Sequence, residues 1–167
     1  MVEPMPDKPE PDNSQKLLLS EGLNSIRKSL QINSLKDIGI NKSLAKFGDA
    51  ITNTIYTIAK TAVLGQFTQR KVNRTILSHA LKNAEMKLYG KTRSDAHAMA
   101  DTTEAFIGFV YCEDGWTIES MGSILIETLK KFDLNDSMME TQAAIEAFTV
   151  LLRKIKKYLV EKYQWEN

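Results

Sequence analysis

Apolar residues recur every three or four positions along most of the chain, which is the spacing of amphipathic helices. The clearest stretch covers residues 42–64 and carries its apolar side chains at 44, 47, 51, 55, 58 and 62. No segment alternates apolar and polar residues over a useful length, so no strand is predicted. The pattern therefore predicts an all-α protein, and its 167 residues suffice for one domain with a substantial core.

Residues that commonly cap helices divide the rest of the chain into further helices. Asn13 or Ser14 would cap a first helix with Leu19, Leu23, Ile26 and Leu30 on one face. The pattern then predicts a helical turn over 35–38, helices over 68–89 and 94–113, a helix capped by Thr117, and a last helix opened by a capping box of Ser137 and Glu140. Proline is absent after Pro11, so none of these helices is interrupted by it.

Residues 1–15 differ in composition from the remainder. They hold all four prolines and a net acidic charge, which predicts a disordered tail before a helical domain over 16–167. This start is unlike a mitochondrial transit peptide or a secretion signal, and the chain has no run of 18 apolar residues to span a membrane. The single cysteine, Cys112, excludes an internal disulfide. These features predict a soluble, cytoplasmic protein.

Basic residues are concentrated in one part of a chain whose net charge is only +1. Between residues 64 and 93 there are seven basic side chains and one acid, Glu85. Phosphate contacts supply most of the sequence-independent affinity of proteins for nucleic acid. Arg70, Lys71 and Arg74 are therefore candidate contacts to an RNA backbone, although a charge run is usually only a solvated face.

Two carboxylates, Asp101 and Glu104, stand at the head of a segment that is otherwise almost entirely apolar through Tyr111. In a helix they project from one face on successive turns. Carboxylates beside a core need a cation or hydrogen-bond donors, and a magnesium ion suits their hard oxygen atoms. The alternative is that acids in a first helical turn merely complement the positive end of the helix dipole.

Asp49 supplies a second acidic site. It follows Gly48 in the 42–64 helix, and Gly108 occupies a similar place behind Glu104. Glycine is unfavourable inside a helix, so the two helices are predicted to cross through these residues and to bring Asp49 near the acidic pair. Alternatively, the glycines are unrelated and Asp49 is simply solvated.

His97 lies four residues before Asp101, on the same predicted helical face. It is a candidate for lining the acidic site, by hydrogen bonding to Asp101 or by contacting a phosphate. The alternative is a partly exposed surface histidine.

Three segments together resemble the ribonuclease III family. Residues 44–50 (LAKFGDA) look like its signature L-E-F-L-G-D-A, residues 100–108 (ADTTEAFIG) like A-D-x-x-E-A-x-I-G, and residues 65–70 (GQFTQR) like G-x-L-S-x-x-R. The resemblance covers roughly residues 40–115. It implies a single, dimeric ribonuclease III-like helical domain of the short form without a double-stranded RNA-binding domain, similar to Mini-RNase III.

The resemblance also implies a function. Asp49, Asp101 and Glu104 match family positions that hold Mg²⁺, for which Mn²⁺ is a substitute, and that position the attacking water. The reaction would be hydrolysis of double-stranded or structured RNA to 5′-phosphate and 3′-hydroxyl ends. Arg93 matches a basic position before the second motif and joins the candidate RNA contacts. The partner would be a second copy of the chain, each copy cutting one strand.

The sequence departs from the family at two positions. The long-form enzymes have glutamates where this chain has Lys42 and Ala45, although short-form members share the Leu-Ala before Gly-Asp. One alternative is therefore a catalytically degenerate RNA-binding scaffold or ribonucleoprotein component. A second alternative is a helical dimer without any role in RNA metabolism.

Overall fold

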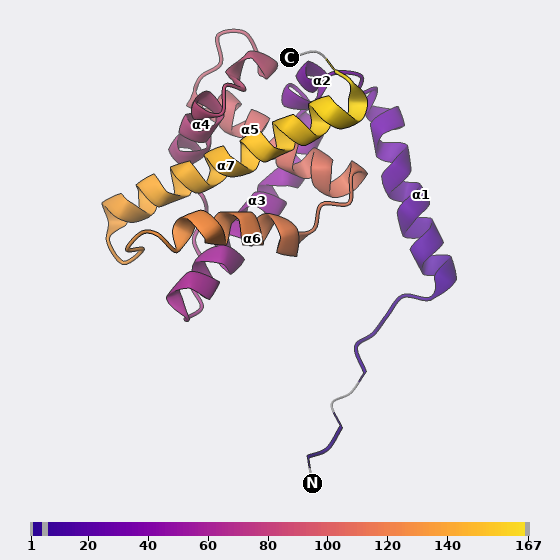
Figure 1. The fold of residues 1–167 in the computed structure, drawn as a ribbon. Helices are drawn as coiled ribbons and strands as arrows, with labels where there is room; N and C mark the ends of the chain where they lie inside the picture. The colour runs from indigo at the N-terminus through magenta and orange to yellow at the C-terminus, as the bar shows by residue number, and fades with distance from the viewer. Residues whose placement is uncertain (1, 5–6, 166–167) are drawn as a thin grey trace.

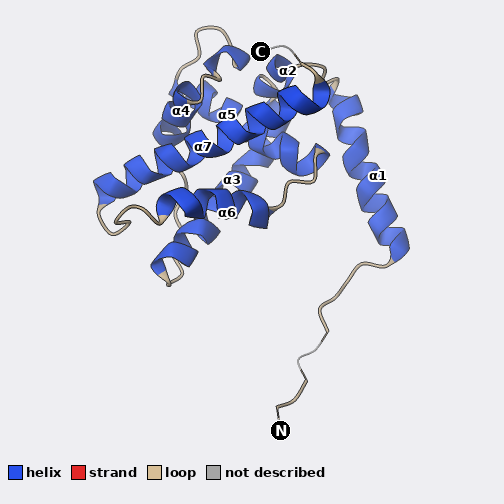
Figure 2. Ribbon diagram, in the orientation of Figure 1, coloured by secondary structure: helices blue, strands red, loops and turns tan. Residues whose placement is uncertain are grey.

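The computed structural model describes residues 2–4 and 7–165, without the side chains of 23–25. Within these residues the protein is all-α and has no strand, which confirms the predicted fold class (Figure 2). Its elements are α1 (Asn13–Leu30), α2 (Leu35–Gly39), α3 (Lys42–Leu64), α4 (Arg74–Asn83), a 3-10 turn η1 (Lys87–Tyr89), α5 (Ala96–Glu113), α6 (Ile118–Leu129) and α7 (Ser137–Tyr163).

The central element is α5, which contacts α1, α2, α3, α4 and α7. It is apolar nearly all round because it is covered on most sides, and residues 105–110 are all buried. The long helix α7 runs across the molecule beside α6 and α4 (Figure 1). Helix α1 projects from this body and exposes Leu17, Leu18 and Leu19.

The helices α3 and α5 cross through two glycines, as the sequence predicts. A Cβ atom on Gly48 would lie 1.8 Å from the carbonyl oxygen of Glu104, and one on Gly108 would lie 2.9 Å from that of Leu44. The two backbones are therefore in direct contact. This contact places Asp49, the residue after Gly48, beside the acidic face of α5.

The predicted helix over 68–89 is wrong in its extent. Residues 67–73 have no regular secondary structure, and α4 begins only at Arg74. Asn73 is the N-cap, with its side chain accepting a hydrogen bond from the amide of Thr75. The amide of Val72 donates instead to the Asn53 side chain of α3, at 2.7 Å. Before Asn73, the Val72 amide is therefore satisfied by a side chain of α3 and not by a carbonyl of its own helix.

Two of the predicted caps are also wrong. Asp12, rather than Asn13 or Ser14, caps α1, and Asp136, rather than Ser137, caps α7. Glu140 forms no capping box; its side chain turns into the protein core. The errors are of one or two positions because aspartate, asparagine and serine are nearly equivalent as N-caps. The Thr117 cap of α6 is confirmed.

Helix α1 begins inside the segment 1–15 that is predicted to be a tail, and residues 2–4 and 7–12 have no regular secondary structure. Residues 1, 5 and 6 of that segment, and the predicted packing of the Leu23 side chain, lie outside the described residues. Across the part of the chain that the structure describes, no helix combines the length and hydropathy needed to cross a membrane.

Candidate active site

A cleft of about 550 Å³ opens between α3, the amino-terminal half of α5 and the segment 67–73. It brings together all three predicted carboxylates, three of the four predicted RNA-binding residues, and the predicted site-lining histidine. Its lining residues are Asp49, Arg70, Lys71, Val72, Asn73, Arg74, His97, Ala100, Asp101 and Glu104. Arg93 is not among them: it lies exposed in the turn before α5, with a left-handed backbone at φ 57°.

The acidic centre of the cleft consists of Glu104, Asp49 and Asp101. Burial raises the pKa of Glu104 to about 8, and the negative charges of Asp49 and Asp101 and a hydrogen bond with Asp49 act in the same direction, against the opposing charge of Lys71. The Asp49 and Asp101 side chains are more open, at 40% and 45% exposure. At neutral pH, Glu104 therefore retains a proton, because its carboxyl group is buried and lies beside two other carboxylates.

This donor set fits magnesium chemically. Carboxylate oxygens are the hard ligands that Mg²⁺ takes, usually one or two of them together with several waters. Glu104 and Asp49, which are close enough to hydrogen bond, would be the first candidates, with Asp101 beside them. Among the described residues no three His, Cys, Asp or Glu side chains already form a metal-holding group. Water ligands would have to complete any magnesium site in this cleft.

A lysine and a histidine flank the acidic centre at longer range. Lys71 Nζ lies 3.8 Å from Asp49 Oδ2, and His97 Nε2 lies 4.0 Å from Asp101 Oδ2. Both contacts are long and largely solvated, so each stabilises little. Lys71 therefore remains available to an incoming anion such as a phosphate group.

A second, smaller hollow lies on the side of Asp101 away from the main cleft. Its lining includes Lys42, Ala45 and Lys91. Ala45 is 5% exposed, so it fills space without contributing an oxygen ligand. The charged side chains around this hollow are Asp101 itself and the two lysines, Lys42 and Lys91.

Asn53 is a site residue that sequence reasoning missed. Its Nδ2 donates to both the carbonyl oxygen and Oδ1 of Asp49 at 2.8 Å, while its Oδ1 accepts from the Val72 amide at 2.7 Å. It thereby orients an acidic residue of the cleft and ties the segment 67–73 to α3. The available signal was its position four residues after Asp49, on the same helical face.

We expect Asn53→Ala to lower the free energy of unfolding by about 1 to 3 kcal/mol, because it leaves the Val72 amide and the Asp49 carboxylate without their partner. Urea denaturation followed by circular dichroism measures this. Thr54→Ala is the matched control: Thr54 is exposed, and its hydroxyl bonds only the carbonyl one turn back. Equal unfolding midpoints for both variants would contradict the role given to Asn53.

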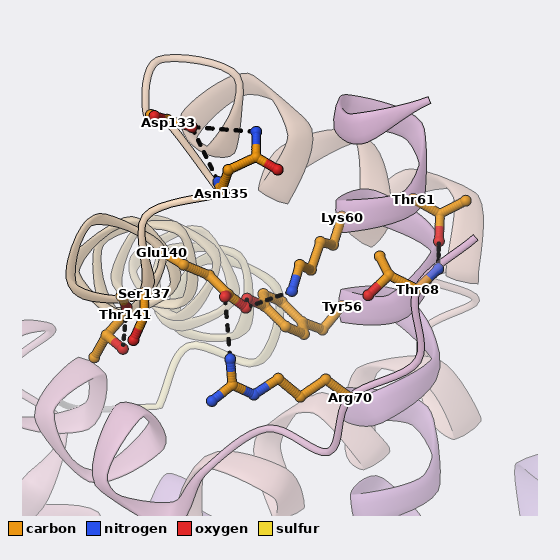
Figure 3. Close-up of polar contacts among 10 residues, drawn as sticks. All are labelled: Tyr56, Lys60, Thr61, Thr68, Arg70, Asp133, Asn135, Ser137, Glu140 and Thr141. Atoms are coloured by element: carbon orange, nitrogen blue, oxygen red, sulfur yellow. Dashed lines mark hydrogen bonds and ion pairs between the residues drawn. The ribbon is translucent and has the colours of Figure 1, made fainter. Parts of the chain in front are cut away.

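A buried polar network lies beside the cleft and was also missed (Figure 3). Glu140 Oε1 accepts hydrogen bonds from Lys60 Nζ at 2.7 Å and from Tyr56 OH at 2.9 Å, and its Oε2 accepts from Arg70 at 3.1 Å. Burial alone would raise the pKa of Glu140, but the hydrogen bonds from Lys60 and Tyr56 and the charges of Lys60 and Arg70 lower it below its ordinary value. Glu140 is therefore an anion that holds Arg70.

The fold and the cleft together define an all-helical domain with an acidic centre flanked by cations. Residues 42–161 match the family model described as Ribonuclease III, which covers more than half of the chain. The chain therefore belongs to the ribonuclease III family. The match includes α3, α5, the segment between them and most of α7. No curated protein was found to match the sequence.

Proposed function

We propose that this protein is a magnesium-dependent endoribonuclease that hydrolyses phosphodiester bonds in double-stranded or structured RNA. The observation that carries the proposal is the cleft in which Asp49, Asp101 and Glu104 lie together with Arg70, Lys71 and Arg74. Family membership supports the same class of activity. The products would carry 5′-phosphate and 3′-hydroxyl ends.

The side chains of the cleft would have different roles in such a reaction. Glu104 and Asp49 would hold Mg²⁺, which when bound supplies the Lewis acidity that offsets charge on the scissile phosphate. Asp101 accepts a hydrogen bond from the attacking water and orients it, while His97 stands beside it. Lys71 and Arg74 bind the flanking phosphates and fix the RNA backbone against the acidic centre.

The basic side chains of the cleft support RNA as the proposed substrate class. A-form RNA is recognised mainly through its phosphates, its 2′-hydroxyl groups and its shape. A domain with a net charge of +1 has little long-range attraction for RNA. A homodimer would place two clefts on one duplex and raise the affinity.

The test is cleavage of a labelled RNA duplex by the purified protein, with Mg²⁺ or with a chelator. We expect cleavage only with the metal, 5′-phosphate ends on the products, and a loss of about a hundredfold or more in Asp101→Asn. Glu127→Gln, at an exposed position on α6, should cut like the wild type. Absence of cleavage of any duplex with Mg²⁺ or Mn²⁺ would overturn the proposal.

A second candidate function is RNA binding without catalysis. Lys42, Ala45 and Lys91 favour it, because they line the hollow at Asp101 without adding a metal-binding oxygen. Tight binding of duplex RNA without turnover, at every Mg²⁺ or Mn²⁺ concentration, would support this scaffold. Metal-dependent cleavage would exclude it.

A further inference from the structure

Glu140 is a buried acid in the first turn of α7, and its side chain turns into the protein interior. Its side chain and that of Lys60 are each only 8% exposed, and they form an ion pair at 2.7 Å. Lys60 by itself balances the charge of Glu140, and Tyr56 adds a neutral hydrogen bond. A buried ion pair is often no more stable than apolar residues of the same volume. Stability therefore does not account for the network.

Arg70 is the member of the network that reaches the cleft. Its side chain is 61% exposed and pairs with Glu140 at 3.1 Å, yet it also lines the cleft with Lys71 and Arg74. Figure 3 shows the carboxylate of Glu140 lying between Lys60 of α3 and the guanidinium of Arg70. The network thus connects the protein interior to the cationic wall of the cleft, which consists of Arg70, Lys71 and Arg74.

The segment 67–73 is held at alternate residues. The Thr68 amide donates to Thr61 Oγ1 at 3.3 Å, the Arg70 side chain to Glu140, and the Val72 amide to Asn53. The intervening Lys71 is directed to the cleft, where it faces Asp49. Glu140 supplies the middle one of the three anchors.

We propose that Glu140 is a positioning residue that, through Arg70, holds the segment 67–73 in place and so sets the cationic wall opposite Asp49 and Glu104. The part of this inference that concerns RNA, namely that the cationic wall contacts RNA phosphates, rests on the proposed function. The anchoring of the segment does not depend on it.

Two physical effects make such an anchor useful. An unrestrained arginine loses side-chain entropy when it binds a phosphate, whereas a prearranged one has lost it already. A free guanidinium next to three carboxylates would also pair with them and compete with a metal ion for the same oxygens. Glu140 supplies a carboxylate outside the acidic centre, so Arg70 lies near the catalytic acids without neutralising them.

The first test needs no RNA. The double variant Lys60→Met/Glu140→Gln removes both buried charges together, so no unpaired charge remains in the core. We expect trypsin to cut after Arg70 or Lys71 about tenfold faster than in the wild type. The rate of amide hydrogen exchange in 67–73 should rise by about the same factor. Glu146→Gln, an exposed position on the same helix, should behave like the wild type. Unchanged proteolysis and exchange in the double variant would overturn the inference.

A second variant tests the anchor from its other end. Arg70→Gln replaces a largely exposed residue, so it is compatible with folding even if the double variant is not. Amide exchange in 67–73 should again rise about tenfold, because the same contact is lost. Exchange rates equal to those of the wild type would show that the contact with Glu140 does not hold the segment.

The third measurement separates this inference from the proposed function. Affinity for duplex RNA, measured without metal, should fall about fivefold to tenfold in the double variant and in Arg70→Gln, and no further when all three changes are combined. If the wild type binds no duplex RNA while its variants still loosen the segment, the proposed function fails and the positioning role stands. Additive losses of affinity would contradict an action of Glu140 through Arg70.

Discussion

Replacing Glu104 with glutamine is expected to reduce RNA cleavage by about a thousandfold or more, because it removes a charged ligand for the metal in the proposed reaction. The same change is expected to stabilise the metal-free protein. Glu104 is crowded by Asp49 and Asp101 and shielded from water, so its ionised form is unfavourable in the fold. Glutamine has the same shape and never ionises.

The sign of the pH dependence follows from the raised pKa of Glu104. The unfolded chain releases this proton near its ordinary pKa of 4.5, whereas the folded protein keeps it up to about pH 8. The wild type therefore loses stability as the pH rises through this window. The advantage of Glu104→Gln should be near zero at pH 4.5 and reach on the order of 2 kcal/mol above pH 8, allowing for partial solvation.

Urea denaturation of both proteins from pH 4.5 to 9, without and with Mg²⁺, measures this advantage. Magnesium should stabilise the wild type at high pH, where the carboxylate is free to bind it, and act much less on the variant. Glu127→Gln provides the control for removing one negative charge at an exposed position. A constant difference between variant and wild type over the whole range would contradict the crowding of charges at Glu104.

Gly48→Ala is expected to lower the free energy of unfolding by about 3 kcal/mol or more, or to prevent folding altogether. The added Cβ would lie 1.8 Å from the carbonyl oxygen of Glu104, so α3 and α5 would have to separate. A backbone atom cannot turn aside as a flexible side chain does. The displacement would also move Asp49 away from Glu104, and activity should fall with stability.

Gly122→Ala is the matched control for this substitution. Gly122 lies in the helix α6, and a Cβ there would meet no atom within 4 Å. Because alanine favours helix more than glycine, this variant should gain up to about 1 kcal/mol. Circular dichroism melts of both variants measure the contrast. Similar melting temperatures for Gly48→Ala and the wild type would refute the close crossing of the two helices.

The parts of the fold that the sequence predicted are those governed by local patterns. The apolar periodicity of α3 predicted the helix, and the nearly uniform apolarity of α5 predicted its burial. The periodicity did not give the buried face of α3 correctly, because Phe47, Ile58 and Ala62 are exposed. The crossing was also predictable, because Gly48 and Gly108 are unfavourable inside helices unless another backbone comes close. The grouping of Asp49 with the acids of α5 followed from that crossing.

The parts that sequence reasoning missed depend on partners far apart in the chain. Helix was predicted over 68–73 from local propensity, but Asn53 takes the amide of Val72. Glu140 was expected to form a capping box with Ser137, whereas its side chain pairs with Lys60, 80 positions earlier. Nothing adjacent to either residue in the sequence reveals these contacts, since their hydrogen-bond partners come together only in the folded chain.

Three contacts, at Thr68, Arg70 and Val72, fix the segment between α3 and α4, so its length matters more than its composition. One residue inserted between Arg70 and Val72 would lengthen the chain between two fixed points and would displace either the contact with Glu140 or the contact with Asn53. Across related chains, the spacing from Thr68 to Val72 should therefore vary little, while the side chains between tolerate wider variation.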